Sequence, residues 1–204
     1  MTTLQPAQDP AFWEGRYQAG RTGWERGVPT PSFLRLLESP TAPAPGRMAV
    51  PGCGRGHDAL SFAARGYEVT GFDFAPSAVT GARELAAAEG LAHLATFVEA
   101  DMFAIAEQYV GTFDFVLERA CFCAIAPVDR GRYVASVRAL LRPGGRLVGS
   151  FFVGPAEGGP PFAASWEEIH ATLAEWFDVE ELGEPEEDSA LDGADQFAIL
   201  RMVR

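Results

Sequence analysis

The sequence predicts an α/β fold in which a mostly parallel sheet is covered by helices on both faces. From about residue 46 onward, short β-branched or aromatic runs alternate with Ala-, Leu- and Arg-rich stretches of helical period. This alternation is typical of parallel strands joined by crossover helices. Near the C-terminal end, two strand-like segments follow each other without a helix between them. We therefore expect a parallel sheet with an antiparallel pair added at its end.

Each predicted element is delimited by residues that start or stop it. Gly66 and Gly90 end the first two helices, and Pro76 suits the first turn of the second. The run 142–145, Arg-Pro-Gly-Gly, cannot continue a helix and ends the third one. The predicted strands are 47–50, 67–72, 95–99, 112–117 and 146–152, and the predicted helices are 58–65, 76–89 and 130–141.

The last third of the chain is less regular. After a Gly/Pro-rich loop at 154–161, Ser165 can cap a helix at about 166–175. Strand-like segments follow at 177–181 and 196–203, and an acidic loop, 183–195, joins them. Because this loop holds no helical pattern long enough to recross the sheet, we expect these two strands to pair antiparallel.

Length and composition indicate one globular domain, 1–204, with an aromatic-rich segment, 1–45, in front of a core, 46–204. The chain has 204 residues, 48% of them hydrophobic, and a formal net charge of −12. The acidic balance argues against nucleic acid and anionic membranes as partners, and no apolar stretch is long enough to span a bilayer. The start of the chain does not resemble a signal peptide, and an odd set of three cysteines fits reduced thiols. We expect a cytoplasmic protein that is a monomer by default.

The strongest local signal is the glycine loop 50–58, Val-Pro-Gly-Cys-Gly-Arg-Gly-His-Asp, between the first strand and the first helix. Glycines allow the backbone to approach a ligand closely, and the helix N-terminus offers unpaired N–H groups. Asp73 lies 21 residues past Gly52 at the end of the second strand, where its carboxylate can accept hydrogen bonds from ribose hydroxyls. A tight strand-to-helix turn alone would explain the loop, but the loop together with Asp73 favours a nucleoside ligand.

The spacing of the glycines in this loop argues against two other classes of nucleotide site. His57 stands where a dinucleotide fingerprint needs its third glycine, and the chain has no Gly-Lys-Ser/Thr of a Walker loop. After the third strand, Asp101 is expected beside an adenine amino group and Met102 against the base.

These motifs resemble class I S-adenosylmethionine-dependent methyltransferases, whose Rossmann-like sheet has seven strands with the last one antiparallel. More closely, the chain is similar to the thiopurine S-methyltransferase superfamily and, within it, to plant-type halide and thiol methyltransferases. The similar segments cover roughly residues 12–203 and occur in the family's order. They are 12–31, with Phe-Trp, Thr-Gly-Trp-Glu-Arg-Gly and Thr-Pro, then the glycine loop, Phe-Cys-Ala-Ile at 122–125 and Gly-Gly-Pro-Pro-Phe at 158–162.

The resemblance implies S-adenosylmethionine as the cofactor and S-adenosylhomocysteine as its product. It also implies that Trp13 and Trp24 cover the cofactor, although core packing would explain two tryptophans equally simply. The expected cofactor-binding residues are Trp13, Trp24, Pro51, Gly52, Cys53, Gly54, Gly56, Asp58, Asp73, Phe74, Asp101, Met102, Phe103 and Glu118. The loops 22–31 and 154–162 are the expected lid.

Glu118 and Arg119 end the fourth strand, at the sheet edge where open α/β folds bind ligands. Arg119 could attract an anionic nucleophile, and Glu118 is the only candidate for a general base, while a surface ion pair between the two remains an alternative. No histidine lies near Cys121 or Cys123, so we do not expect either to be a nucleophile. Phe152 stands where the halide and thiol enzymes have a tyrosine, which puts halide transfer in doubt. Together with Arg119, Trp13 and Trp24, Phe152 is expected to favour the anionic nucleophile and to keep water out of the site.

Methyl transfer from a sulfonium to an anion is an in-line displacement that needs alignment and desolvation more than acid–base groups. The sequence therefore favours a small-molecule methyltransferase acting on a soft nucleophile, namely a thiol, bisulfide, a thiopurine or a halide. Oxygen, nitrogen, tellurite or selenium acceptors remain alternatives. Two other classes remain open: a non-catalytic sensor of S-adenosylmethionine or S-adenosylhomocysteine, and an NAD-type oxidoreductase, against which His57 argues. No spacing suggests a metal site.

Overall fold

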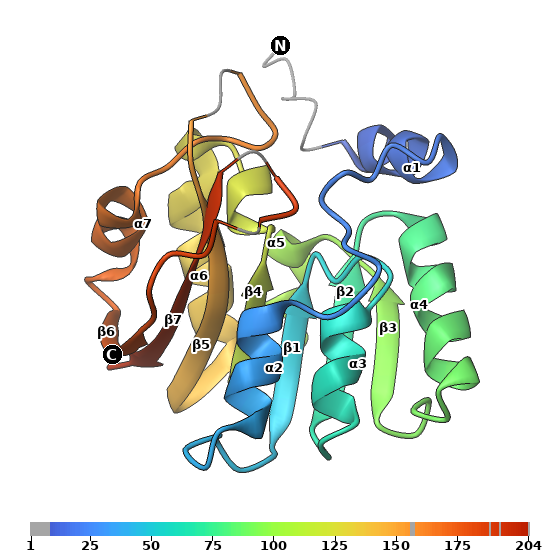
Figure 1. Ribbon diagram of the computed structural model, residues 1–204, viewed down its shortest axis with the longest axis horizontal. Helices are drawn as coiled ribbons and strands as arrows, with labels where there is room; N and C mark the ends of the chain where they lie inside the picture. The colour runs from blue at the N-terminus through green and yellow to red at the C-terminus, as the bar shows by residue number, and fades with distance from the viewer. Residues whose placement is uncertain (1–8, 156–157, 188, 192, 204) are drawn as a thin grey trace.

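A computed structural model describes residues 9–155, 158–187, 189–191 and 193–203. Its centre is a seven-stranded sheet in the order β3-β2-β1-β4-β5-β7-β6. The strands are β1 (Arg47–Pro51), β2 (Glu68–Asp73), β3 (Ala95–Glu99), β4 (Phe113–Arg119), β5 (Leu141–Val153), β6 (Phe177–Leu182) and β7 (Ala194–Met202). The pairs from β3 across to β5 are parallel, whereas β7 runs antiparallel to both β5 and β6. The predicted fold class is confirmed (Figure 1).

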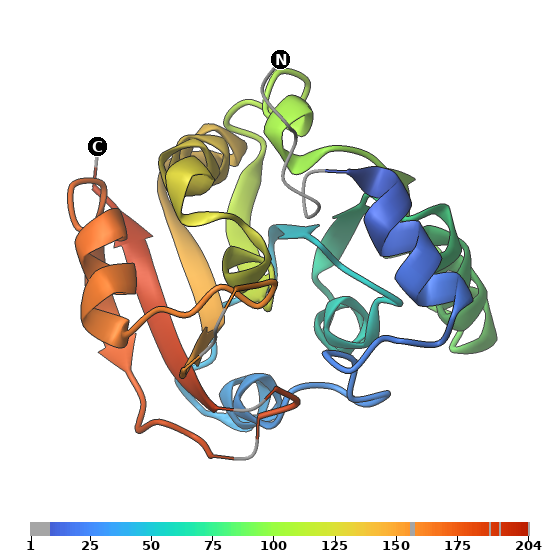
Figure 2. The same ribbon diagram turned by 90° about the horizontal axis from the view of Figure 1, so that it is seen from above.

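Helices cover both faces of the sheet (Figure 2). One face packs against α2 (Pro31–Glu38), α3 (His57–Ala63) and α4 (Pro76–Ala88). The other packs against α5 (Met102–Ile105), α6 (Arg130–Leu140) and α7 (Trp166–Leu173). Two short 3₁₀ turns, Phe122–Ala124 and Pro127–Asp129, lie between β4 and α6.

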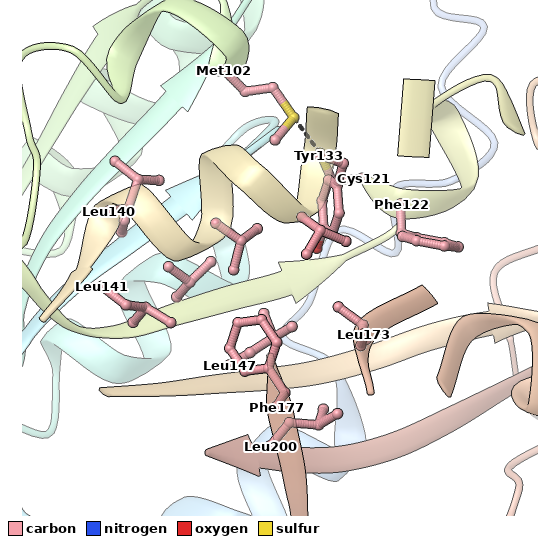
Figure 3. Close-up of a cluster of buried hydrophobic side chains, with 14 of the residues drawn as sticks. Met102, Cys121, Phe122, Tyr133, Leu140, Leu141, Leu147, Leu173, Phe177 and Leu200 are labelled. Atoms are coloured by element: carbon pink, nitrogen blue, oxygen red, sulfur yellow. Dashed lines mark hydrogen bonds between the residues drawn. The ribbon is translucent and has the colours of Figure 1, made fainter. Parts of the chain in front are cut away.

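The core on the α6 side is built from alternate residues of the central strands. Tyr133 and Leu140 of α6 belong to one buried cluster with Leu147 of β5 and Leu200 of β7, and all four are fully buried (Figure 3). Strands buried on both faces need apolar side chains on both, which explains the unbroken apolar run 115–117 in the middle of β4.

The segment in front of β1 contains two helices that the sequence did not predict: α1 (Pro10–Gln18) and α2. Asp9 caps α1 by accepting a hydrogen bond from the backbone N–H of Ala11. The helix is held on α4, because Glu14 accepts hydrogen bonds from the backbone N–H and the hydroxyl of Ser77. Residues 1–8, on which part of the signal-peptide argument rests, lie outside the described residues.

The strand β5 begins five residues earlier than predicted. Leu141 pairs with Phe113 and Arg146 with Phe115, so 142–145 bulges out between two paired stretches. The prediction that Pro-Gly-Gly ends the helix is correct, since α6 stops at Leu140. None of the helices in the described part of the chain has the length and apolar character needed to cross a bilayer.

Candidate active site

A cavity of about 350 Å³ lies where the carboxyl ends of the central strands meet the N-terminal segment. This is where open α/β sheets bind their ligands, and the volume is in the range of small-molecule sites. Its lining residues come from segments far apart in the chain: Trp13, Arg16, Tyr17, Gly23, Trp24, Gly52, Phe72, Asp73, Phe74, Ala100, Met102, Arg119, Ala120, Cys121, Cys123, Ala124, Ile125, Pro160, Pro161, Ala190 and Leu191. A smaller cavity of about 60 Å³ shares Trp24, Gly52, Arg119 and Ala120 with it and is also lined by Val50 and residues 53–58 of the glycine loop.

The glycine loop turns from β1 into α3 through three residues with positive φ. Gly52, Gly54 and Gly56 have φ values of +63°, +53° and +81°. These left-handed conformations are readily accessible only to glycine, so the G-x-G-x-G spacing is a requirement of the backbone. A Cβ on Gly52 would approach the Cys121 side chain to 3.2 Å, which shows how closely the turn after β4 lies on the loop.

The Asp73 carboxylate is fixed at the edge of the cavity by the loop itself. Its Oδ2 accepts a hydrogen bond from the Gly54 N–H and its Oδ1 one from the Ala75 N–H, both at 2.9 Å. Burial raises the pKa of Asp73, and the two backbone donors act in the opposite direction. Because each carboxylate oxygen can accept a second hydrogen bond, the group remains able to bind hydroxyls of a ligand.

Aromatic side chains of the N-terminal segment form one wall of the cavity. Trp24 packs edge-on against both Trp13 and Tyr17, with ring centroids 5.4 and 5.7 Å apart. Arg16 also lines the cavity, and its guanidinium lies 5.8 Å from the Trp24 ring. Arg16 and Tyr17 were not predicted as site residues. The sequence could have identified them, because they follow Trp13 by three and four residues and such residues share one face of a helix.

Two polar contacts tie the N-terminal segment to the glycine loop. Glu25 forms an ion pair with Arg55, and its Oε1 also accepts a hydrogen bond from the Arg55 N–H. Asp58, predicted as a cofactor-binding residue, accepts hydrogen bonds from the Thr30 N–H at 2.6 Å and the Thr30 hydroxyl at 3.1 Å. Asp58 lines the smaller cavity, and its hydrogen-bond partner there is Thr30 of the N-terminal segment.

Glu118 does not face the cavity. Its side chain is buried and accepts hydrogen bonds from the backbone N–H groups of Cys121 and Phe122, at 3.0 and 2.8 Å, and from the Tyr133 hydroxyl at 2.6 Å. Burial raises the pKa of Glu118. The structure therefore corrects the expectation of a general base or cofactor contact here, because these bonds use the carboxylate to hold the turn after β4.

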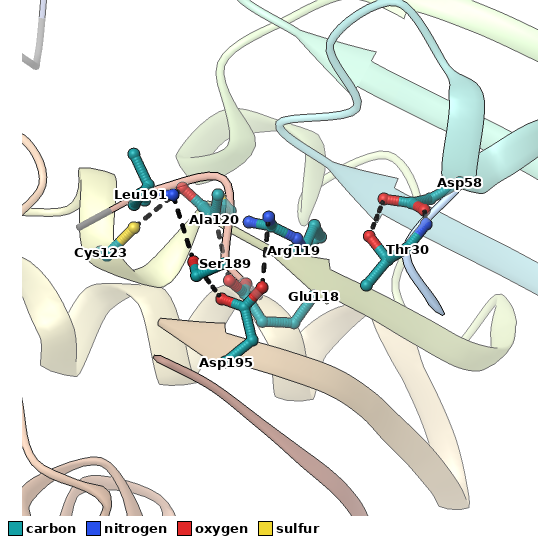
Figure 4. Close-up of polar contacts among 10 residues, drawn as sticks. Thr30, Asp58, Glu118, Arg119, Ala120, Cys123, Ser189, Leu191 and Asp195 are labelled. Atoms are coloured by element: carbon teal, nitrogen blue, oxygen red, sulfur yellow. Dashed lines mark hydrogen bonds and ion pairs between the residues drawn. The ribbon is translucent and has the colours of Figure 1, made fainter. Parts of the chain in front are cut away.

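Arg119 does reach the site. Its side chain is only 8% exposed, lines both cavities, and lies 3.4 Å from Asp195 of β7 between Nη2 and Oδ2 (Figure 4). The expected alternative of a surface pair with Glu118 is wrong, since the partner is Asp195 and both groups are buried. The next residue, Ala120, has φ +56°, a strained conformation for a residue with a Cβ.

The remaining predicted residues divide into two groups. Phe74 and Met102 line the main cavity, and Cys53, Gly54 and Gly56 line the smaller one. Besides Glu118, four predicted residues lie outside both linings: Pro51, Asp101, Phe103 and Phe152. Asp101 instead caps α5 by accepting the Phe103 N–H at 2.8 Å, and Phe152 is buried in the sheet.

The cysteines of the site are neutral thiols. All three in the chain are free, and Cys121 and Cys123 line the cavity. Burial raises the pKa of Cys121 well above its usual value and that of Cys123 to about 12. No group of three or more His, Cys, Asp or Glu side chains that could hold a metal ion occurs among the described residues.

A profile of the family described as "Thiopurine S-methyltransferase (TPMT)" matches residues 8–201. The chain belongs to the thiopurine S-methyltransferase family. It is 33% identical over 162 residues to a probable thiol methyltransferase 2 of Arabidopsis thaliana, covering 79% of this chain and 70% of that protein. It is 35% identical to thiocyanate methyltransferase 1 of Brassica oleracea, covering 74% of this chain and 66% of the relative.

Solved structures agree on the fold. A 1,6-didemethyltoxoflavin-N1-methyltransferase of Burkholderia thailandensis, solved with S-adenosylhomocysteine, superposes with a TM-score of 0.78 at 21% identity over 100% of this chain and 93% of that one. The predicted reaction class and donor are confirmed: the protein is an S-adenosylmethionine-dependent methyltransferase.

The residues present fit S-adenosylmethionine. The cradle at Gly52 lies beside the Asp73 carboxylate, which suits a ribose, and both border an aromatic cover that suits a sulfonium. Arg119 stands where the two cavities meet, and its buried Nε and Nη1 have no hydrogen-bond partner among the described residues. Such orphaned donors indicate a place for an anionic or polar group of a ligand.

Proposed function

We propose that this family member transfers the methyl group to a small soft nucleophile, a thiol or bisulfide foremost, with thiopurines and halides as further acceptors. The observation that carries the proposal is the buried Arg119 guanidinium with unpaired N–H groups on the main cavity. Relatives named as thiol, thiocyanate and thiopurine methyltransferases support a sulfur acceptor.

When bound, S-adenosylmethionine supplies an electrophilic methyl group on a sulfonium, and S-adenosylhomocysteine is left after transfer. The chain's part is to hold the two reactants in line and exclude water. Asp73 and the glycine loop hold the nucleoside, and Trp13 and Trp24 cover the cavity. Arg119 is left to attract the nucleophile, because a charge-assisted hydrogen bond favours its anionic form.

Among the described residues, Asp73 is the only carboxylate that lines the main cavity, and it is assigned to the nucleoside, which favours sulfur over oxygen or nitrogen acceptors. A thiol with a pKa near ~8.5 is already partly ionised at neutral pH, whereas alcohols and amines need a base within hydrogen-bond reach. Glu118 is occupied by three donors and does not line the cavity. Phe152 does not line it either, so the missing tyrosine at this position carries no argument against halides.

The test measures S-adenosylhomocysteine formation with bisulfide, thiocyanate, iodide, an aromatic thiol and a thiopurine. We expect turnover of sulfur acceptors and, for Arg119→Met, a kcat/KM about 30-fold lower, which corresponds to about 2 kcal/mol for a lost charged hydrogen bond. The matched control is Arg142→Met, which removes an exposed arginine paired with Asp114 at the opposite edge of the sheet.

Donor affinity, measured separately by calorimetry, decides which ligand Arg119 serves. Weaker donor binding with unchanged acceptor kinetics would contradict the proposal and assign Arg119 to the donor. Donor binding without turnover of any acceptor would favour the sensor alternative. We further propose that 1–204 works as one unit, as a monomer, with a small-molecule rather than a nucleic-acid partner. The free cysteines support action in the reducing cytoplasm.

A further inference from the structure

Arg119 has a buried acidic partner that comes from the far end of the chain. Asp195 stands in register with Phe152 of β5, so the sheet sets its position, and its side chain is 5% exposed. Its Oδ2 lies 3.4 Å from Arg119 Nη2, and its Oδ1 accepts a hydrogen bond from the Ser189 hydroxyl at 3.0 Å (Figure 4).

The short loop before β7 joins this ion pair to the cavity. Ser189 Oγ also accepts a hydrogen bond from the Leu191 N–H at 3.2 Å, and Leu191 lines the cavity beside Arg119. Asp195 itself is not among the lining residues, so it acts on a ligand indirectly, through Arg119, through this loop or through the field of its charge.

The pair has a formal charge of zero, which changes what Arg119 can attract. An anion entering the cavity experiences the attraction of the guanidinium and the repulsion of the carboxylate behind it. A permanent anion such as iodide or thiocyanate must lose its hydration shell on entry without the full compensation of a cation. A thiol with an ordinary pKa enters mostly neutral and does not meet this penalty.

We propose that Asp195 is a specificity-determining positioning residue that acts through Arg119. It holds the guanidinium on the cavity and offsets its charge, so that thiols are preferred over permanently charged small anions. The thiol gives its proton to a solvent base, its sulfur forms the bond to the methyl carbon, and the bond from that carbon to the donor sulfur breaks. This inference rests on the proposed function, because it assumes that Arg119 serves the acceptor.

The decisive variant is Asp195→Asn, which keeps the side-chain shape and the oxygen that accepts from Ser189 but removes the charge. We expect KM for thiocyanate, and the inhibition constant of chloride, to fall about tenfold, the effect of one unit charge at ~10 Å in an effective dielectric constant near 20. KM for a neutral aliphatic thiol should change less than about threefold. Asp195→Glu should restore the wild-type preference.

The charge-matched control is Glu180→Gln, which also removes one negative charge but from an exposed group paired with Arg146 and Arg201. It should leave all acceptor constants unchanged. If Asp195→Asn is too unstable for kinetics, thermal unfolding in a chloride titration still tests it, because an anion that binds the folded state raises Tm. The rise should be larger in Asp195→Asn than in wild type or Glu180→Gln.

An equal loss of activity toward thiols and anions in Asp195→Asn, with no gain in chloride affinity, would overturn the proposal. Asp195 would then have only a structural role. The proposed function would survive that result, since the wild type would still methylate thiols. Absence of turnover with every acceptor in the wild type would overturn the proposed function and, with it, the inference that rests on it.

Discussion

Replacing Tyr133 by Phe tests whether Glu118 is scaffold or catalyst. The substitution removes the hydroxyl that donates to Glu118 Oε2 at 2.6 Å and leaves a ring of nearly the same volume in a fully buried position. A hydrogen bond to a charged group contributes about 2 kcal/mol to the free energy of unfolding. For a chain of this length we expect Tm to fall by about 4–8 °C.

The pH dependence of this loss has a defined sign. Burial raises the pKa of Glu118, and the Tyr133 bond opposes that rise, so the variant has a still higher pKa. A carboxyl with a raised folded-state pKa contributes stability that is lost as the pH rises through that pKa. The destabilisation should therefore be largest at pH values above the raised pKa, where the carboxylate is ionised in both proteins, and should shrink at lower pH, where Glu118 is protonated in both.

Urea unfolding from pH 4 to 8 and kcat with a thiol acceptor are the measurements. The control is Tyr109→Phe, because the Tyr109 ring packs on Phe72 and Phe113 and no hydrogen bond of its hydroxyl occurs among the described residues. We expect kcat of Tyr133→Phe to stay within about threefold of wild type, since the bond holds a turn and touches no reactant. An unchanged unfolding free energy together with a hundredfold lower kcat would refute this reasoning and return Glu118 to catalysis.

Three further results are expected. Gly56→Ala should lower the unfolding free energy by at least about 1 kcal/mol more than Gly90→Ala. Both positions have positive φ, but only at Gly56 would the Cβ come within 2.9 Å of an aromatic ring, so equal losses in urea unfolding would contradict the contact. Iodoacetamide should label Cys121 and Cys123 slowly in the folded protein at pH 8, because the raised pKa values keep both thiols protonated; mass spectrometry showing rapid labelling would be inconsistent with their burial. Asp73→Asn should weaken S-adenosylhomocysteine binding about tenfold in calorimetry, as expected for a lost charge-assisted hydrogen bond, and an unchanged Kd would show that the nucleoside is held elsewhere.

Local sequence patterns predicted most of the strands and helices. The strands β1 to β5 and the helices α3, α4 and α6 were predictable because glycine and proline positions delimit them and apolar runs identify strands buried on both faces, whereas the short helix α5 was not predicted. The helices α1 and α2 were missed, because aromatic residues among glycines and prolines do not form a clear helical period. They are held by contacts outside the segment, such as Glu14 with Ser77 and Thr30 with Asp58.

The candidate site was likewise predicted in part from local sequence and decided in part by contacts between distant segments. The chain order of the glycine loop, Asp73 and Met102 predicted that these residues meet, because consecutive parallel strands present their carboxyl ends at one edge, and the structure places Gly52, Asp73 and Met102 on one cavity. Only the tertiary structure decided which of two adjacent charged residues faces the cavity. Alternate residues of a strand point to opposite faces, and near the end of β4 the turn directs Glu118 to Tyr133 and Arg119 to Asp195. The partner of Arg119 lies seventy-six positions away, and no local pattern of charge or period records a contact that forms only when β7 pairs with β5.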